Sequence, residues 1–278
     1  MSSQTPRPAL GWFISDSLAV TKRHVIKITR IPETLFFALI QPVMFVLLFA
    51  FVFGGAINLG DGGDPKAYRE FLIPGIFAQT VMFAVASITV GITEDANKGI
   101  MDRFKSLPMS PGAVLSGHTF ASLVQNLLVI VMLSITGYAV GWRIRGSAVD
   151  TLLGFALLAL FAYAITWMGA WIGLHMPSPE VAGTAGLAWI FPLTFASSVF
   201  TPIATMPSWL QGFAQWNPVS CLALATRDLF GNPIPFPGTS FPEQHAVALS
   251  FGYAFLILAI FAPLSVRAFK SRSANSRG

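Results

Sequence analysis

The hydrophobic residues of this chain fall into long runs. Six runs reach the length of about 20 mostly apolar residues that an α-helix needs to cross the hydrocarbon core of a bilayer. They cover residues 34–57, 71–93, 114–141, 151–176, 181–203 and 246–266. A helix on the surface of a soluble protein keeps a polar face toward water, whereas these runs are apolar all round. The pattern therefore predicts an all-α integral membrane bundle of six transmembrane helices, with a permease domain at 34–266.

The composition and the distribution of charge support this interpretation. Charged residues make up 10% of the chain and hydrophobic residues 54%, whereas soluble domains carry about 25% charged residues. If both termini are cytoplasmic, twelve of the 17 Lys and Arg residues lie inside, in agreement with the positive-inside rule. We therefore interpret the excess of basic residues as a mark of membrane topology and not as a nucleic-acid surface.

The segments outside the runs, 1–33 and 267–278, are predicted to be cytoplasmic, and the second is a basic tail. The first apolar run starts too deep and is too long for a cleaved signal peptide. On a helix, five N-terminal residues form one stripe: Ile14, Leu18, Thr21, Val25 and Ile28. Three basic residues lie on the opposite face: Arg23, Lys27 and Arg30. This pattern is typical of an amphipathic helix in the membrane interface, and the alternative is ordinary anchoring charge for the first span.

The loop between the second and third runs, residues 94–112, combines charged and apolar side chains. Two pairs have the i,i+4 spacing of helical ion pairs: Glu94–Lys98 and Lys98–Asp102. They predict a short helix that ends at Leu107-Pro108, with Pro111 at the first position of the next helix. Four apolar side chains are expected on its surface: Ile100, Met101, Phe104 and Leu107. We expect this loop to dock onto a cytosolic partner, and the alternative is a solvated loop that lies on the bilayer.

Residues 204–232, between the fifth and sixth runs, contain two apolar stretches that are each too short to span. Trp209 and Trp216 have the character of residues at a membrane–water interface. Four other residues punctuate the segment: Pro207, Asn217, Pro218 and Arg227. We predict a short outer helical hairpin that dips into the outer leaflet, and the alternative is an ordinary extracellular helix packed on the bundle.

The centres of the six runs contain no Asp, Glu, Lys or Arg. An ion-driven carrier normally needs an ionisable group within the membrane, so this absence disfavours that mechanism. Four amide side chains remain that could contact a substrate or form hydrogen bonds between helices: Gln41, Gln79, Gln125 and Asn126. Two G-x-x-x-G spacings, Gly137–Gly141 and Gly169–Gly173, indicate close packing of helices.

The sequence shows no arrangement of residues typical of an enzyme. None of the four His residues has metal-ligand spacing with another: His24, His118, His175 and His245. The pattern G-x-x-x-x-G-K-[ST] is absent, so the chain is not expected to bind ATP through a P-loop. A single cysteine, Cys221, excludes an internal disulfide framework.

These features resemble the membrane component of ABC exporters of the second type, which export drugs, polysaccharides and lipids. The resemblance covers nearly the whole chain and includes the basic N-terminal helix and the layout of six runs. It also rests on three stretches: Lys98-Gly99-Ile100-Met101-Asp102-Arg103-Phe104-Lys105-Ser106-Leu107-Pro108, Pro207-Ser208-Trp209 with Asn217-Pro218 and Arg227, and Leu72-Ile73-Pro74-Gly75. Asp102-Arg103-Phe104, Ser106-Leu107-Pro108 and the last stretch look most like the permeases of daunorubicin/doxorubicin-resistance exporters.

The resemblance implies a division of labour. A separate cytosolic ATPase would hold ATP and Mg²⁺, and this chain would be a non-catalytic subunit without a cofactor or metal of its own, in the bacterial plasma membrane. The ATPase would push on a coupling helix formed by Glu94, Lys98, Gly99, Asp102, Arg103, Leu107 and Pro108. A second permease, identical or paralogous, would complete the pathway for a hydrophobic or amphipathic cargo. We expect four residues to line that pathway: Gln41, Gln79, Thr194 and Phe195.

Other classes of protein stay open at this point. A lipid or polysaccharide exporter would share much of the pattern. An ion-driven carrier would depend on an essential carboxylate. A membrane-embedded enzyme would need a cluster of catalytic groups near one interface, and an assembly protein would show no transport.

Overall fold

The computed structural model describes residues 15–22, 26, 32–53, 64–99 and 111–275, and helix is the only regular secondary structure in these ranges. The long elements are α2 (Pro32–Leu47), α3 (Pro65–Asn97), α5 (Pro111–Val140), α6 (Ala148–His175), α7 (Pro179–Phe195) and α11 (Ala246–Asn275). The short elements are the π-helix η1 (Leu48–Phe53), the 3-10 helix η2 (Ile203–Thr205), α8 (Ser208–Trp216), α9 (Pro218–Leu229) and α10 (Phe241–Gln244). Residues 15–22 are also helical.

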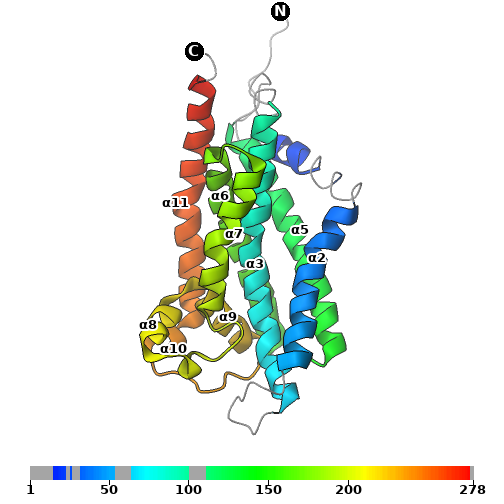
Figure 1. Cartoon of the computed structure of the whole chain (residues 1–278), viewed down its shortest axis with the longest axis vertical. Helices are drawn as coiled ribbons and strands as arrows, with labels where there is room; N and C mark the ends of the chain where they lie inside the picture. Colours follow the sequence, from blue (N-terminus) through cyan, green and yellow to red (C-terminus); the bar gives the residue numbers. More distant parts are fainter. Residues whose placement is uncertain (1–14, 23–25, 27–31, 54–63, 100–110, 276–278) are drawn as a thin grey trace, which may run out of the picture.

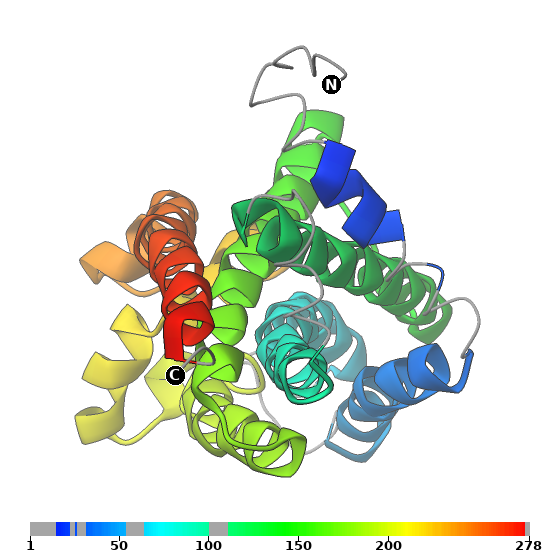
Figure 2. The ribbon, with the colours of Figure 1, turned by 90° about the horizontal axis from the view of Figure 1, so that it is seen from above.

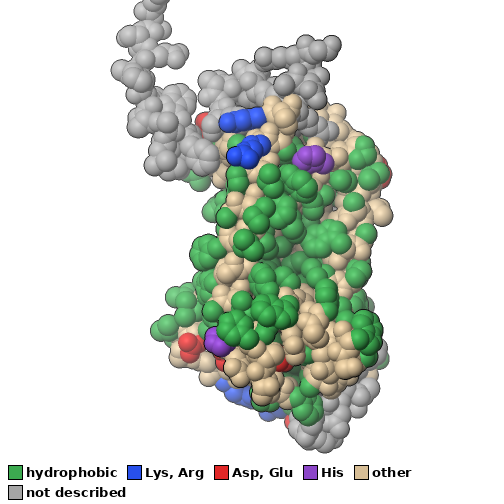
Figure 3. Space-filling view, turned by 90° about the vertical axis from the view of Figure 1, so that its left-hand side faces the viewer, with side chains coloured by type: hydrophobic (Ala, Val, Ile, Leu, Met, Phe, Trp, Pro, Cys, Tyr) green, Lys and Arg blue, Asp and Glu red, His purple; other side chains and the backbone are tan. Residues whose placement is uncertain are grey.

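The long helices run side by side along the long axis of the molecule (Figure 1). Four helices of the described chain are long and apolar enough to cross a membrane: Pro65–Asn97, Gly112–Val140, Ala148–His175 and Ala246–Ser271. A shorter apolar helical stretch covers Leu39–Val52. The short helices α8, α9 and α10 gather at one end of the bundle, while residues 15–22 and the end of α11 lie at the other (Figure 1). Hydrophobic side chains form a broad belt between the two ends (Figure 3).

Helix α3 is the centre of the bundle, and it contacts α2, α5, α6, α7 and α9 (Figure 2). In its most apolar stretch 83% of the residues are buried, compared with 11% in α11. Helix α11 therefore leaves most of its apolar surface for lipid, whereas α3 needs close partners on every side.

The two G-x-x-x-G spacings have different structural roles. Gly169 and Gly173 bring α6 against α3, where the hydroxyls of Thr89 and Thr93 donate to the carbonyl oxygens of Gly169 and Gly173 over 3.1 Å and 2.9 Å. This confirms the packing interpretation for that pair, since a Cβ atom on either glycine would come within 2.4 Å or 2.6 Å of α3. Gly141 instead ends α5 with a φ of +105°, a conformation that favours glycine.

The fifth run is helical over a shorter range than the sequence predicts. It was expected at 181–203, whereas α7 ends at Phe195. The physical reason is a capping side chain from a distant segment, because the amide of Asn217 donates to Leu193 O (2.7 Å) and Ala196 O (3.0 Å). The same side chain accepts from Val219 N (2.9 Å) and so begins α9. One side chain thereby provides hydrogen-bond partners for backbone carbonyl oxygens at the end of α7 and for a backbone N–H at the start of α9.

The charged helix expected from Glu94 to Leu107 is described only over its first residues. Glu94 to Asn97 form the last turn of α3, Gly99 has a φ of +66°, and residues 100–107 lie outside the described residues. A regular α-helix cannot continue through that conformation. Helix α5 does begin at Pro111, as the sequence predicted.

Candidate functional site

A pocket of about 160 Å³ lies between α2, α3 and α5, with Leu187 of α7 at its edge, and it is partly open because Gln41 and Ser87 of its lining are exposed. Seven polar side chains line it: Gln41, Gln79, Thr80, Ser87, Ser122, Gln125 and Asn126. The larger apolar side chains that line it are Phe45, Phe83, Val129 and Leu187. Among the described residues of the lining, none carries a formal charge. The pocket is therefore polar and neutral within an otherwise apolar part of the molecule.

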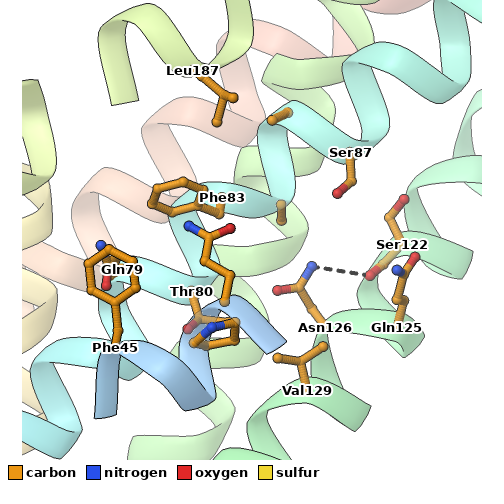
Figure 4. Close-up of a pocket in the computed structure, with 14 residues that line it drawn as sticks. Phe45, Gln79, Thr80, Phe83, Ser87, Ser122, Gln125, Asn126, Val129 and Leu187 are labelled. Carbon is orange, nitrogen blue, oxygen red and sulfur yellow. Dashed lines mark hydrogen bonds between the residues drawn. The ribbon is translucent and has the colours of Figure 1, made fainter. Parts of the chain in front are cut away.

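The structure brings together all four amide side chains that the sequence singled out within the spans. Gln41 comes from α2, Gln79 from α3, and Gln125 with Asn126 from α5. Figure 4 shows the α5 side chains on one side of the pocket and Gln79, beside Phe45, on the other. Asn126 donates to Ser122 O of its own helix over 3.3 Å. The amides thus face a common space instead of joining the helices directly.

Gln79 is the most deeply placed of these side chains, with 3% of its surface exposed. Its Nε2 atom and the hydroxyl of Thr80 are buried without a hydrogen-bond partner. A buried polar atom without a partner costs on the order of 1–3 kcal/mol. The amide nitrogen of Gln79 is therefore buried at a cost to stability, with less than 1 Å² of accessible surface.

Two aromatic rings form the apolar part of the pocket. Phe45 stacks on Phe200, with 6.0 Å between ring centroids. Phe83 meets Phe191 of α7 edge to face at 5.3 Å. These contacts hold both rings from behind, so a flat apolar molecule could pack against them without displacing their neighbours.

The two other residues expected along the pathway lie outside this pocket. Thr194 is fully buried near the end of α7, and its hydroxyl has no hydrogen-bond partner. Phe195 is about half exposed and stacks on Phe200 at 5.2 Å. Phe200 also stacks on Phe45, which lines the pocket. Phe195 is therefore connected to the pocket indirectly, through Phe200 and Phe45.

The expected coupling loop begins where α3 ends. Glu94 accepts a hydrogen bond from Lys98, and both side chains are exposed. That hydrogen bond and the negative charge of Glu94 raise the pKa of the Lys98 ammonium. Gly99 is half-buried in the turn that follows. Asp102, Arg103, Leu107 and Pro108 lie outside the described residues, as do Arg23, Lys27 and Arg30 of the N-terminal segment.

A buried pair that the sequence did not reveal joins the two helices on either side of this loop. His118 Nε2 of α5 lies 3.2 Å from Asp95 Oδ2 of α3, and both side chains are almost fully buried. One residue before His118, the carbonyl oxygen of Gly117 accepts a hydrogen bond from Thr21 over 3.2 Å. A Cβ atom on Gly117 would lie 2.5 Å from Cβ of Val20, so helix 15–22 packs tightly there. Asp95 lies in the last turn of α3 and His118 about two turns inside α5, and nothing in the sequence pairs them.

Helix 15–22 packs on α5 beside the stripe that the sequence predicted for the membrane interface, and Ile14, Val25 and Ile28 of that stripe lie outside the described residues. Val20 and Thr21 are buried against α5, whereas Leu18 is 58% exposed. Thr21 belongs to both faces. The reason is that Gly117 leaves room for Val20, a contact between segments far apart in the chain.

Arg227 is the other buried ionisable residue of functional interest, and the sequence had placed it on the outer side. It is fully buried in α9. Its guanidinium donates to Phe71 O (2.8 Å), Ser198 O (2.7 Å) and Val199 O (3.1 Å), and to the Ser198 hydroxyl (3.3 Å). The guanidinium carbon also lies 3.7 Å from the centre of the Phe71 ring. Arg227 thus joins α9, α3 and the segment after α7.

The remaining residues of the predicted outer hairpin surround this contact. Pro207 precedes α8, and Trp209 and Trp216 on α8 are 79% and 55% exposed. Pro218 occupies the first turn of α9, directly after the capping Asn217. The described structure therefore contains two short helices at 208–216 and 218–229, with exposed aromatic side chains on the first.

The long apolar helices are those of a multi-pass membrane protein. The family model described as ABC-2 type transporter matches residues 16–230, so the chain belongs to the ABC-2 type transporter family. This family consists of permease subunits of ABC transporters, which are generally non-catalytic, and the resemblance noted in the sequence is confirmed.

Several characterised or named relatives match most of the chain. The daunorubicin resistance ABC transporter permease protein DrrB1 of Streptomyces coeruleorubidus is 27% identical over 270 residues, which cover 97% of this chain and 91% of the relative. The probable doxorubicin resistance ABC transporter permease protein DrrC of Mycobacterium tuberculosis is 21% identical over 226 residues, 81% of this chain and 80% of the relative. The putative transport permease ycf38 of Cyanophora paradoxa is 24% identical over 255 residues, 90% of this chain and 86% of the relative.

Proposed function

We propose that this chain is the transmembrane permease subunit of an ATP-driven ABC exporter, which moves a hydrophobic or amphipathic, drug-like molecule out across the plasma membrane. The observation that carries the proposal is a neutral polar pocket within the apolar bundle of an ABC-2 type transporter. Relatives named for daunorubicin and doxorubicin resistance support the class of cargo. A lipid or a polysaccharide is the alternative cargo for the same mechanism.

Six membrane crossings with cytoplasmic termini are part of the proposal. Helix α2 continues through 16 residues into the 6 residues of η1, and α7 has 17 residues. These lengths lie within or at the edge of the range of about 17–25 residues that spans a bilayer. Residues 15–22 and the end of α11 lie at the same end of the bundle, as an even number of crossings requires (Figure 1). Arg267 and Lys270 at that end favour the cytoplasmic side.

A separate cytosolic ATPase subunit supplies the energy in this proposal. Its closure on ATP and Mg²⁺ would push on the loop at 94–112. The Asp95–His118 contact and the bond from Thr21 to Gly117 support this role, because they tie α3, α5 and helix 15–22 together at the base of the loop. A movement of the loop would then reach three helices at once.

A second permease and the surrounding lipid are the other proposed partners. The pocket lies within one bundle, so a second copy of the chain or a paralogous permease would complete a continuous pathway. Trp209 and Trp216 would place the segment 204–232 in the outer leaflet, since exposed Trp favours the membrane interface. The basic residues Arg23, Lys27 and Arg30 would contact lipid phosphates on the inner side.

The first test is a purification of the full chain from its host in mild detergent, followed by mass spectrometry of the proteins that accompany it. We expect a stoichiometric soluble ATPase with a P-loop. Reconstituted with that ATPase in vesicles, the complex should move daunorubicin or doxorubicin only when ATP is present. Repeated isolation of the chain without any nucleotide-binding partner would contradict the proposal.

Charge reversal in the coupling loop is a second test. We expect Asp102→Lys or Arg103→Glu to lower ATP-driven transport at least tenfold while the protein still folds and inserts. The reason is that the ATPase would meet a surface of opposite charge. Lys270→Glu is the matched control, because Lys270 is an exposed basic residue at the same end of the bundle. Normal transport by both loop variants would show that the loop does not dock onto the ATPase.

One observation favours a different mechanism and needs its own experiment. The buried Asp95–His118 pair is ionisable, as the coupling site of an ion-driven carrier would be. Transport is measured while a protonophore dissipates the proton gradient and ATP is held constant. We expect no change in rate, and a collapse of transport would favour the ion-driven carrier.

A further inference from the structure

We propose that the pocket between α2, α3 and α5 is filled with water from the cytoplasmic side and receives the neutral polar part of an amphipathic cargo, whose apolar part stays among the lipid tails. This inference rests on the proposed transport function and adds the route by which the cargo enters. The structure then corresponds to a state that is open on the inner side and closed on the outer side.

The polar side chains that can meet a ligand lie on the open side of the pocket. Gln41 of α2 and Ser87 of α3 are exposed, and Ser122 and Gln125 of α5 are half-buried. These four side chains therefore have accessible surface, in contrast to the buried amide nitrogen of Gln79. Within the part of the chain that the structure describes, neither the Gln41 nor the Gln125 amide forms a hydrogen bond. Each amide thus keeps two donor hydrogens and an acceptor oxygen for another molecule.

The two amides lie at the depth of the lipid tails. At about 1.5 Å per residue, Gln41 lies about 14 Å from the start of α2 and Gln125 about 21 Å from the start of α5. The hydrocarbon core of a bilayer is about 30 Å thick. An amide that faces hydrocarbon without a hydrogen-bond partner is costly, so lipid tails are unsuited to fill the pocket.

Water fits the pocket both by volume and by chemistry. A cavity needs at least about 10–15 Å³ of such volume for one water molecule, and the pocket has about 160 Å³. The accessible amides and hydroxyls provide the two to four polar partners that a bound water requires. A hydroxyl or amide group of a cargo could replace these waters and keep their hydrogen bonds. An ionic group would lose water without gaining an ion pair, because none of the described residues of the lining carries a formal charge.

Stacked aromatic rings close the pocket on the side away from the cytoplasm. Phe45 lines the pocket and stacks on Phe49 of η1 (5.8 Å between ring centroids) and on Phe200 (6.0 Å). The rings of Phe49 and Phe200 lie 4.3 Å apart, and Phe200 is buried. Both Phe45 and Phe49 follow Gln41 along the chain, toward the end of the bundle that carries α8, α9 and α10 (Figure 1). Water that enters from the inner side therefore stops at these three rings.

The test measures the reactivity of single cysteines placed in the pocket of the full chain. Ser87→Cys and Ser122→Cys are treated with a membrane-impermeant, positively charged methanethiosulfonate in membrane vesicles of either orientation. The reagent attacks the thiolate, which forms only where water reaches the sulfur. The native Cys221 is buried, so the wild type gives the background. We expect both variants to react at least tenfold faster from the cytoplasmic side than from the outer side.

Two further variants separate hydration from simple exposure. Leu128→Cys is the matched control, because Leu128 also lies on α5 and is 44% exposed but does not line the pocket. It should stay unreactive from both sides, since its surroundings are lipid. Phe49→Ala removes one of the three stacked rings. In that background Ser122→Cys should react from the outer side as well.

Octyl glucoside, which joins a neutral sugar to an apolar chain, is the probe for the cargo. Below the concentration at which it forms micelles, it should slow the modification of Ser122→Cys at least about threefold. Gln125→Leu in the same background should remove this protection and leave the reaction from the cytoplasmic side. Gln244→Leu is the control, because Gln244 of α10 is an exposed glutamine outside the pocket, and protection should persist.

Three results would overturn the inference. The first is that Ser87→Cys and Ser122→Cys react no faster than Leu128→Cys, which would show that lipid or a second copy of the chain covers the pocket. The second is an equal rate from both sides with Phe49 intact, and the third is protection that survives in Gln125→Leu. The cysteine measurements do not involve the ATPase. Reactive cysteines without ATP-driven transport would therefore contradict only the proposed function, whereas transport with unreactive cysteines would contradict only this inference.

Discussion

Replacement of Arg227 by leucine is expected to detach α9 from α3 and to destabilise the protein by about 3 kcal/mol, since each buried carbonyl that loses its donor costs on the order of 1–3 kcal/mol. The guanidinium donates hydrogen bonds to Ser198 O and Val199 O in the segment after α7, and to Phe71 O of α3. Among the described residues, no carboxylate forms an ion pair with it. Carbonyl dipoles and the face of Phe71 therefore stabilise the buried charge in place of a counter-ion.

The single cysteine of the chain provides a direct measurement of this detachment. Cys221 lies on α9 and is buried. A maleimide probe should leave it unmodified in the folded wild type and label it rapidly in Arg227→Leu, together with a lower melting temperature in detergent. Arg227→Lys should be intermediate, because an ammonium cannot reproduce the planar fork of donors.

The matched control for Arg227 is Arg143→Leu. Arg143 is an exposed arginine that donates to Tyr138 O and Trp142 O of neighbouring residues (both 2.7 Å). Its replacement should change stability by less than about 0.5 kcal/mol, as is usual for exposed positions. A stable Arg227→Leu protein with an unreactive cysteine would show that the guanidinium does not hold the outer helices in place.

The second large effect is expected from Gly169→Val, which should push α6 away from α3. Already the first atom of a side chain would lie 2.4 Å from Cγ2 of Ile88 and 2.9 Å from Val85 O. Overpacking of a close contact costs about 1–3 kcal/mol, and loss of the bond from Thr89 to Gly169 O adds to it. We expect little folded protein by size-exclusion chromatography and a markedly lower melting temperature in what remains.

Gly91→Ala is the control for this prediction. Gly91 lies within α3 and, like Gly169 of α6, is a glycine inside a long helix. Outside the backbone of its own helix, no atom lies within 4 Å of a Cβ added to it. Alanine at such a site should be neutral or stabilise the helix by up to about 1 kcal/mol. If Gly169→Val melted like Gly91→Ala, the contact between α3 and α6 would be looser than the structure indicates.

The positions of the long helices could be predicted from the sequence because their cause is local. A run of apolar residues in a membrane must satisfy its backbone hydrogen bonds within itself, so it forms a helix. The runs at 71–93, 114–141, 151–176 and 246–266 correspond to α3, α5, α6 and α11, each of which extends beyond its run at one end or both. The end of α7 could not be predicted, since its cap comes from Asn217.

In the candidate site, too, the sequence identified residues by local features but not the contacts between distant segments. The sequence identified the residue types, since amides in apolar runs are unusual enough to single out Gln41, Gln79, Gln125 and Asn126. It did not show that they share one pocket, and it favoured Thr194 and Phe195, which lie elsewhere. Which face of a buried helix meets which neighbour depends on packing between segments far apart in the chain, and α3 is apolar on nearly every side.

The sequence by itself therefore determined the membrane character of the protein and its helical elements, since hydrophobicity and turn residues act over one or two helical turns. Its class was indicated by the resemblance to a known family. Only the tertiary structure decided that Asp95 meets His118, that Arg227 is buried among carbonyl groups, and that Nε2 of Gln79 is buried without a partner. These arrangements depend on close approach of α3 to α5, α6 and α9. Such approach is set by the fit of whole helix surfaces, and of these contacts only that between α3 and α6 left a periodic signal in the sequence, the Gly169–Gly173 spacing.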